Sequence, residues 1–343
     1  MKLVAFLNKS IFVFIVSILS VSCAARDIEF SVTPSRDRME VDSVFSKNSA
    51  YFTSKGSSQV GIYSRNPYKR TGSICCHKGE RTEEFFLKNG EGNDLLMQLK
   101  QGEGHSDAVP MLSVFDTEGK LMAGPLNLKN SQSQLIAVSP SKEKFAVLDR
   151  GNIIVYSSNL KIIKEYSASK ELSDIDAIAL SNDANSVLVK NSQSLVYVDL
   201  NARKEVNVQS CDIVANQSVT LNAYETEENR FFVVANTGES CVINQGKAEE
   251  FKLTNIKDRV IGVYAAGSDL YVLTESSIFV FDQESLYKKG EFNLPAYYAK
   301  QFGDSDPYQL PLILKSEFDW HGQKLYLRGH KSTKKFYEIG VIN

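Results

Sequence analysis

The residue types best suited to hold a metal ion gather near one part of the sequence. Cys75, Cys76 and His77 stand in a row, and His105 and Asp107 follow in a glycine-rich segment. Thiolates and imidazoles are good ligands for zinc or copper. The three neighbours and His105 are therefore a candidate metal site, provided that the fold brings both segments together. The alternative is that they are unrelated loop residues, with the thiols buried in an outer strand.

A second segment carries side chains that favour binding. Residues 293–311 contain three Tyr and one Phe and have Pro toward both ends. Binding concentrates on long exposed loops with aromatic side chains, and Pro limits the conformations of such loops. We therefore expect a partner-binding surface, unless the aromatic rings cover the core beneath them. Its candidate residues are Tyr297, Tyr298, Phe302, Asp306, Tyr308, His105 and Asp107.

Catalytic signatures are absent from the sequence. It contains none of the patterns G-x-S-x-G, H-E-x-x-H, G-x-x-x-x-G-K-[ST] and G-x-G-x-x-G. Only 4 histidines are present, which limits acid–base and metal chemistry. Residues 319–322 include Asp and His, but no Ser nucleophile can be assigned to them by spacing, and a turn with a packed Trp fits better. We expect no enzyme activity and no cofactor.

The composition is that of a globular protein with a large core. The chain has 343 residues, of which 43% are hydrophobic and 23% are charged. Its 39 Lys and Arg are spread among 41 Asp and Glu, for a formal net charge of −2. Phosphate binding needs clustered excess cations, so nucleic acid is not an expected partner.

Residues 1–23 have the layout of a secretory signal. Lys2 and Lys9 precede an apolar run from Ile11 to Val21, and small residues follow this run. A transmembrane anchor is the alternative, but the run is short for a span of about 20 apolar residues. We expect export, with residues 24–343 as one mature domain.

The sequence around Cys23 leaves two kinds of processing open. The letters LSVSC resemble a bacterial lipoprotein box, in which the Cys is lipidated, although Ser20 stands where an aliphatic residue is usual. Ordinary cleavage after Ala24 or Ala25 is the alternative. A lipid on Cys23 would tether the protein to a membrane without spanning it. The expected location is periplasmic or outer-membrane-associated, and otherwise secreted.

Export places the remaining cysteines in an oxidising compartment, where disulfides persist. Neighbours such as Cys75 and Cys76 rarely bond each other, because the bond strains the peptide between them. Cys211 with Cys241 is the favoured pair, although four cysteines allow three pairings and the sequence does not choose among them.

A β-hairpin pattern recurs along the chain. Two apolar runs around a polar turn occur in EKFAVLDRGNIIVYSS, NSVLVKNSQSLVYVDL, NRFFVVANTGESCVINQ and SDLYVLTESSIFVFDQ. The spacings from Phe145 to Val187, Phe231 and Leu270 are 42, 44 and 39 residues. Three looser copies lie near Tyr51, Leu96 and Leu325. A period of about 40–50 residues with several strands is typical of a β-propeller blade.

The copies predict an all-β fold, a seven-bladed β-propeller of four-stranded blades. Each hairpin follows an inner apolar strand and precedes an outer strand with Lys and Glu, as expected at an edge. The last copy stops after its third strand, and residues 26–32 supply an orphan strand that would pair beside it and close the ring. A six-bladed ring or a two-sheet β fold is the alternative, because the first, second and seventh copies are weak.

The copies at 137–166 and 179–206 resemble the broad propeller class that includes WD-repeat, YVTN-type and quinoprotein-like proteins. The shared feature is a Ser-Pro-Asp-Gly-like turn before a strand, here Ser139–Lys142 and Ser181–Ala184. This resemblance implies the fold and no activity. With 1 Trp, the chain lacks the repeated tryptophan docking of quinone dehydrogenases. In architecture it also resembles outer-membrane assembly lipoproteins.

These features predict an exported, non-catalytic propeller that acts as a protein-binding platform at the cell envelope. Two other functions stay open. One is a hydrolase or lyase in the central channel, and the other is a propeller that binds a small ligand or glycan through its tyrosines. Converging carboxylates or histidines on the innermost strands would favour the enzyme. Those strands are mostly apolar, with Asp42 and Glu317 as exceptions.

Overall fold

The computed structural model describes 28 strands and many of the turns between them. The described residues are 29–34, 43–45, 49–53, 59–65, 68–75, 80–102, 109–128, 135–149, 151–169, 175–192, 194–208, 211, 219–223, 230–253, 256, 258–293, 296, 300, 315–319, 324–328 and 336–342. Over these residues, no helix is long and apolar enough to cross a membrane.

The described strands form seven four-stranded antiparallel sheets, and six of these follow the chain order. The first contains β2 (Ser43–Phe45), β3 (Ser49–Thr53), β4 (Gln59–Arg65) and β5 (Tyr68–Cys75). The second contains β6 (Glu80–Lys88), β7 (Asp94–Gly102), β8 (Met111–Phe115) and β9 (Leu121–Asn127). The third contains β10 (Ile136–Val138), β11 (Lys144–Asp149), β12 (Asn152–Ser157) and β13 (Ile162–Ser167).

The next three sheets repeat this arrangement. The fourth contains β14 (Ile175–Leu180), β15 (Ser186–Asn191), β16 (Leu195–Asp199) and β17 (Lys204–Asn207). The fifth contains β18 (Val219–Ala223), β19 (Arg230–Ala235), β20 (Glu239–Asn244) and β21 (Lys247–Lys252). The sixth contains β22 (Val260–Ala266), β23 (Asp269–Thr274), β24 (Ser277–Asp282) and β25 (Lys288–Asn293).

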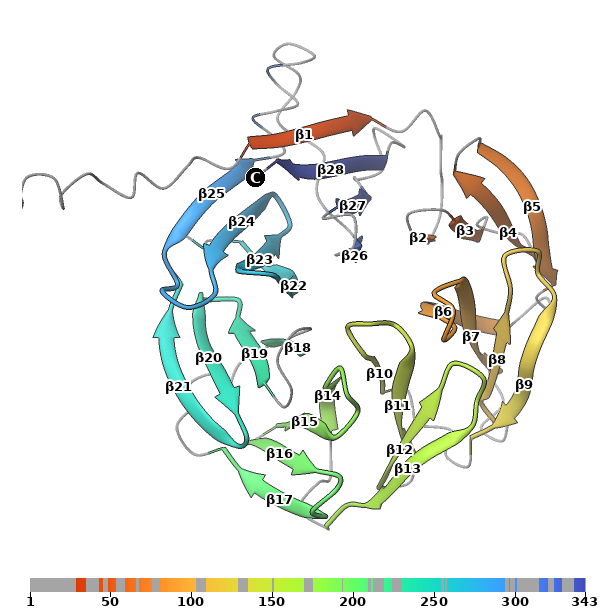
Figure 1. Ribbon diagram of the computed structural model, residues 1–343, viewed down its shortest axis with the longest axis horizontal. Helices are drawn as coiled ribbons and strands as arrows, with labels where there is room; N and C mark the ends of the chain where they lie inside the picture. Colours follow the sequence, from red (N-terminus) through yellow and green to blue (C-terminus); the bar gives the residue numbers. More distant parts are fainter. Residues whose placement is uncertain are drawn as a thin grey trace, which may run out of the picture.

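The seventh sheet joins strands from the two ends of the described chain. β1 (Glu29–Pro34) pairs with β28 (Phe336–Ile342), and β27 (Lys324–Arg328) and β26 (Lys315–Asp319) complete the sheet. Figure 1 shows the sheets standing around a centre, with β6, β10, β14 and β18 inside and β9, β13, β17 and β21 outside. An all-β propeller of four-stranded blades is thereby confirmed.

The five sheets from β6 to β25 show why the hairpin strands are mostly apolar and do not alternate. β15 and β23 are buried along their whole length. Apolar clusters span neighbouring sheets: one includes Val155 of β12 and Val198 of β16, and another includes Phe232 of β19 and Phe281 of β24. A strand covered on both faces has no solvent-facing positions, so its sequence does not alternate, and its few charged residues, such as Lys190 and Asp269, meet ionic partners.

The turns between the first and second strands follow the Ser-Pro-Asp-Gly-like pattern for a local reason. The hydroxyl of Ser181 accepts a hydrogen bond from the Ser186 amide at 3.0 Å, and Ser139 does the same for Lys144 at 3.2 Å. The last turn residues, Lys142 and Ala184, have φ of 67° and 63°, the left-handed region that favours Gly. The hydroxyl and the left-handed residue together close the turn.

Contacts between blades occur near the centre and at the outer rim. Near the centre, the Lys88 amide donates to the Lys142 carbonyl at 2.8 Å, which links the second blade to the third. At the rim, the turn between the third and fourth strands of a sheet packs against the outer strand of the preceding sheet. The pairs in contact there are Gly119 with Ser73, Leu160 with Gly124, and Gly246 with Val206.

Candidate functional site

The candidate metal ligands lie almost entirely outside the described residues. β5 ends at Cys75 and β6 begins at Glu80, so Cys76 and His77 fall in the connection between these strands. His105 and Asp107 fall between β7 and β8, also outside the described residues. Within the described ranges, no group of three His, Cys, Asp or Glu side chains is placed to hold a metal ion. The metal site stays a prediction.

The start of the aromatic segment is fixed against the sixth blade. The side chain of Asn293 accepts a hydrogen bond from the Ala296 amide at 2.8 Å and donates one to the Ser277 hydroxyl at 3.1 Å. Ser277 follows the turn between β23 and β24, so the segment begins beside that turn. The other predicted residues lie outside the described ranges: Tyr297, Tyr298, Phe302, Asp306, Tyr308 and Cys23.

A disulfide joins Cys211 to Cys241, the pair that the sequence favours, with their Cα atoms 6.2 Å apart. Cys241 lies on β20, and Cys211 lies between β17 and β18. Both are fully buried in an apolar cluster that includes Leu188 and Phe231. The bond therefore ties the connection between the fourth and fifth blades to the centre of the fifth.

A cavity of about 260 Å³ lies among the innermost strands of four successive blades. Lys142 is the one charged side chain in its lining, and every other lining residue is apolar. Those residues are Phe85, Phe86, Ile136, Ala137, Val138, Ile178, Ala179, Leu180 and Leu221. Such a lining offers no acid–base pair to a substrate.

Two carboxylates on the described innermost strands are held within their own sheets. Glu84 on β6 accepts a hydrogen bond from Gln98 on β7 at 3.3 Å. Asp176 on β14 pairs with Lys190 on β15 at 3.0 Å. Glu84 and Asp176 add to the charged residues that the sequence placed on inner strands. Each is oriented by a structural neighbour.

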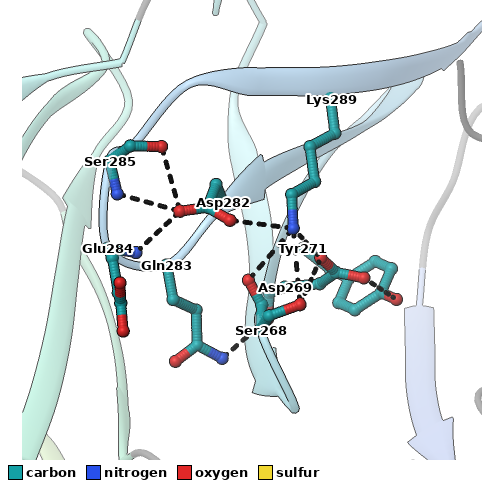
Figure 2. A network of polar contacts seen from close by, with 8 residues as sticks. All are labelled: Ser268, Asp269, Tyr271, Asp282, Gln283, Glu284, Ser285 and Lys289. Carbon is teal, nitrogen blue, oxygen red and sulfur yellow. Dashed lines mark hydrogen bonds and ion pairs between the residues drawn. The ribbon is translucent and has the colours of Figure 1, made fainter. Parts of the chain in front are cut away.

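Figure 2 shows a denser polar network in the sixth blade, centred on Lys289. The Lys289 ammonium lies 2.6 Å from Asp269 Oδ1 and 2.9 Å from Asp282 Oδ2. Asp269 begins β23, Asp282 ends β24 and Lys289 lies on β25, so one cation joins three strands. Only 9% of the Asp269 side chain and 23% of the Lys289 side chain are exposed. The network therefore holds the last three strands of the sixth blade together.

The carboxylate of Asp282 also holds the turn that follows it. Its Oδ1 accepts hydrogen bonds from the amides of Ser285 at 2.9 Å and Glu284 at 3.1 Å. The hydrogen bond from the Ser285 amide and, to a smaller extent, the one from Lys289 hold the pKa of this carboxyl well below its usual range. The side chains of Asp116 and Asp199 likewise accept a hydrogen bond from the backbone amide two residues later in the chain. The Asp that ends the third strand of several repeats therefore closes a turn.

A second polar link joins the outer strands of the third and fourth blades. Glu205 on β17 accepts hydrogen bonds from the Tyr166 hydroxyl at 2.9 Å and from the Ser169 amide at 2.8 Å. Burial and, to a smaller extent, the hydrogen bond to this carboxylate raise the pKa of Tyr166 to about 12. Burial alone would raise the pKa of Glu205, but the hydrogen bonds from Ser169 and Tyr166 together outweigh it and lower that pKa.

Replacing Glu205 with glutamine is expected to loosen this link. The amide oxygen is a weaker acceptor than a carboxylate, so we expect a loss of about 1 kcal/mol in the free energy of unfolding. The pKa of Tyr166 should fall toward its ordinary value, which NMR titration of the labelled tyrosine would measure. Glu249→Gln, at an exposed position of β21, is the control, and equal losses in both variants would contradict the assignment.

Exposed aliphatic side chains gather on two neighbouring outer strands. We call Leu121 and Met122 of β9 and Ile162 and Ile163 of β13 the rim cluster. Sequence reasoning missed it, since outer strands were expected to carry Lys and Glu. The available signal was the repeated order of Lys and two aliphatic residues at the start of an outer strand.

The arrangement defines a propeller with structural polar networks and an apolar rim cluster, and no family model matches the chain. Among solved structures, it is similar to apo AztD from Citrobacter koseri, with a TM-score of 0.51 and 13% identity over 76% of this chain and 72% of that one. This likeness supports the fold alone. Among curated proteins, the DNA-directed RNA polymerase subunit beta' of Wigglesworthia glossinidia brevipalpis is 20% identical over 226 residues. That match covers 63% of this chain and 16% of that protein.

Proposed function

We propose that this protein is an exported β-propeller that binds a protein partner at the cell envelope and does no chemistry of its own. The observation that carries the proposal is the rim cluster. Large aliphatic side chains on the outer strands of two neighbouring blades are exposed, and exposed apolar side chains that gather in one region mark interaction sites. The ionisable networks around Lys289 and Glu205, by contrast, hold strands and turns together.

Export and a closed ring of seven blades are parts of the same proposal. The signal-like residues 1–23 support export, and the Cys211–Cys241 disulfide fits an oxidising compartment. The pairing of β1 with β28 supports closure of the ring by the N-terminal strand. Such a ring gives binding surfaces a rigid support, which lowers the ordering cost of association.

The test is affinity purification of the tagged protein after cross-linking in cells of its source organism, compared with the tag on an unrelated exported protein. We expect one partner to be enriched at least tenfold. A variant with Tyr297, Tyr298 and Tyr308 changed to Ala reports whether the aromatic segment takes part. Failure to recover a partner with the native chain would contradict the proposed function and direct attention to ligands of the central cavity.

A further inference from the structure

The rim cluster stands out among the described side chains by its exposure. Leu121 is 46% exposed, Met122 56%, Ile162 59% and Ile163 41%. Only Val109 and Tyr287 are comparable among the large hydrophobic side chains of the described residues.

The four side chains of the cluster belong to one region of the surface. A β-carbon on Gly124 of β9 would lie 3.1 Å from the side chain of Leu160, so β9 touches the turn that leads into β13. Met122 lies two residues before this contact and Ile162 two residues after it. The two aliphatic pairs therefore stand on either side of one inter-blade contact.

Two exposed lysines border the cluster without ionic partners. Lys120 precedes Leu121, and Lys161 precedes Ile162. No described carboxylate pairs with either ammonium, whereas the comparable Lys288 pairs with Glu291 at 2.7 Å. Carboxylates brought by a partner would complement both cations, and this steers association as well as fixing its register.

The backbone of β9 does not favour binding by strand addition. Pro125 lies within this outermost strand and lacks the amide that an added strand would use. On β9, recognition therefore falls to side chains. Glu118 and Glu165 are exposed nearby in sequence, and this mixture of signs suits a protein better than an anionic membrane surface.

A second copy of this chain is the alternative occupant. A symmetric contact through the rim cluster would place the same patch on both copies, and the experiment below would reveal it as an adduct between two copies.

From the exposed aliphatics and unpaired lysines, we infer that the rim cluster docks a segment of the protein partner that carries aliphatic side chains and carboxylates. This inference rests on the proposed function and names the surface and the chemistry of the partner. The aliphatic side chains would cover Met122 and Ile162, and the carboxylates would meet Lys120 and Lys161.

The test places a photo-cross-linking amino acid at Met122 of the full chain in cells of the source organism. The control is the same group at Glu250, an exposed position on β21. We expect one protein adduct at Met122 and none at Glu250. Mass spectrometry of the adduct should map to an aliphatic and acidic segment. A lipid adduct, an adduct with a second copy or a segment without acidic residues would overturn the inference.

Charge reversal provides the second arm. Lys120→Glu with Lys161→Glu should lower the adduct yield at least tenfold, and Lys247→Glu with Lys252→Glu, at exposed positions of β21, should leave it unchanged. Melting curves of both variants test whether each is folded. A partner recovered by affinity purification without an adduct at Met122 would leave the proposed function standing and reject this surface. Recovery of no partner would reject both.

Discussion

Replacing Lys289 with methionine is expected to lower the free energy of unfolding by about 2–3 kcal/mol, between the values typical of exposed and buried ion pairs. The change leaves the carboxylate of Asp269, with only 9% of its side chain exposed, without its cation. Methionine preserves most of the apolar stem, so lost packing contributes little. Urea denaturation followed by circular dichroism measures the effect.

The neighbouring lysine supplies a matched control. Lys288 pairs with Glu291 at 2.7 Å, and its ammonium lies 5.5 Å from the centre of the Phe279 ring. The side chain of Glu291 is 35% exposed, so solvent screens this ion pair as it does other surface pairs. Lys288→Met should therefore cost less than about 1 kcal/mol. Equal losses for Lys288→Met and Lys289→Met would contradict the structural role of the network.

Acid titration separates the charge effect from a packing effect. The folded-state pKa of Asp282 is depressed, so its contribution is present above the unfolded pKa of about 4 and is lost as the pH falls through the folded value. Lys289→Met removes part of the cause of that depression. The difference in stability between native protein and variant should therefore shrink as the pH falls below about 4.

Replacing Gly72 with alanine is expected to destabilise the protein by about 3 kcal/mol, at the upper end of ordinary overpacking. A β-carbon there would lie 2.0 Å from the carbonyl oxygen of Glu118 and 2.4 Å from its carbon. Both are backbone atoms of the turn between β8 and β9, which Asp116 holds through two amides. The turn would have to leave β5, and hydrogen exchange at residues 116–120 should increase.

Gly90 is the control for this substitution. It lies in the turn between β6 and β7, and a β-carbon there would meet nothing within 4 Å. Gly90→Ala should change the free energy of unfolding by less than about 1 kcal/mol, because it affects mainly the unfolded chain. A Gly72→Ala variant as stable as Gly90→Ala would show that the two blades are not packed as described.

The repeat pattern predicted the hairpins well because periodic apolar runs depend on local sequence. The segment EKFAVLDRGNIIVYSS forms β11 and β12 as expected. The rim cluster was not predictable by the same means. Ile153 and Ile154 are buried whereas Ile162 and Ile163 are exposed, because β12 is an internal strand of the sheet and β13 is its edge. Identical residue pairs therefore have opposite roles.

The candidate site was less accessible to sequence reasoning than the fold. Lys288 and Lys289 are neighbours in the sequence, yet only Lys289 meets a buried carboxylate, which comes from a strand two positions back in the sheet. The predicted metal and aromatic residues belong to connections whose course depends on tertiary contacts, and they stay predictions. The Cys211–Cys241 pair was within reach because few pairings existed.

If Cys23 carries a lipid, the pairing of β1 with β28 sets which part of the ring lies closest to the membrane. Between a lipid-bearing Cys23 and Glu29, the first residue of β1, five residues intervene, and they reach about 20 Å when fully extended. Such a short linker would keep the seventh sheet close to the bilayer. β13 lies across the ring from β1 (Figure 1). The ring itself would then act as a spacer that holds this outer strand away from the lipid surface.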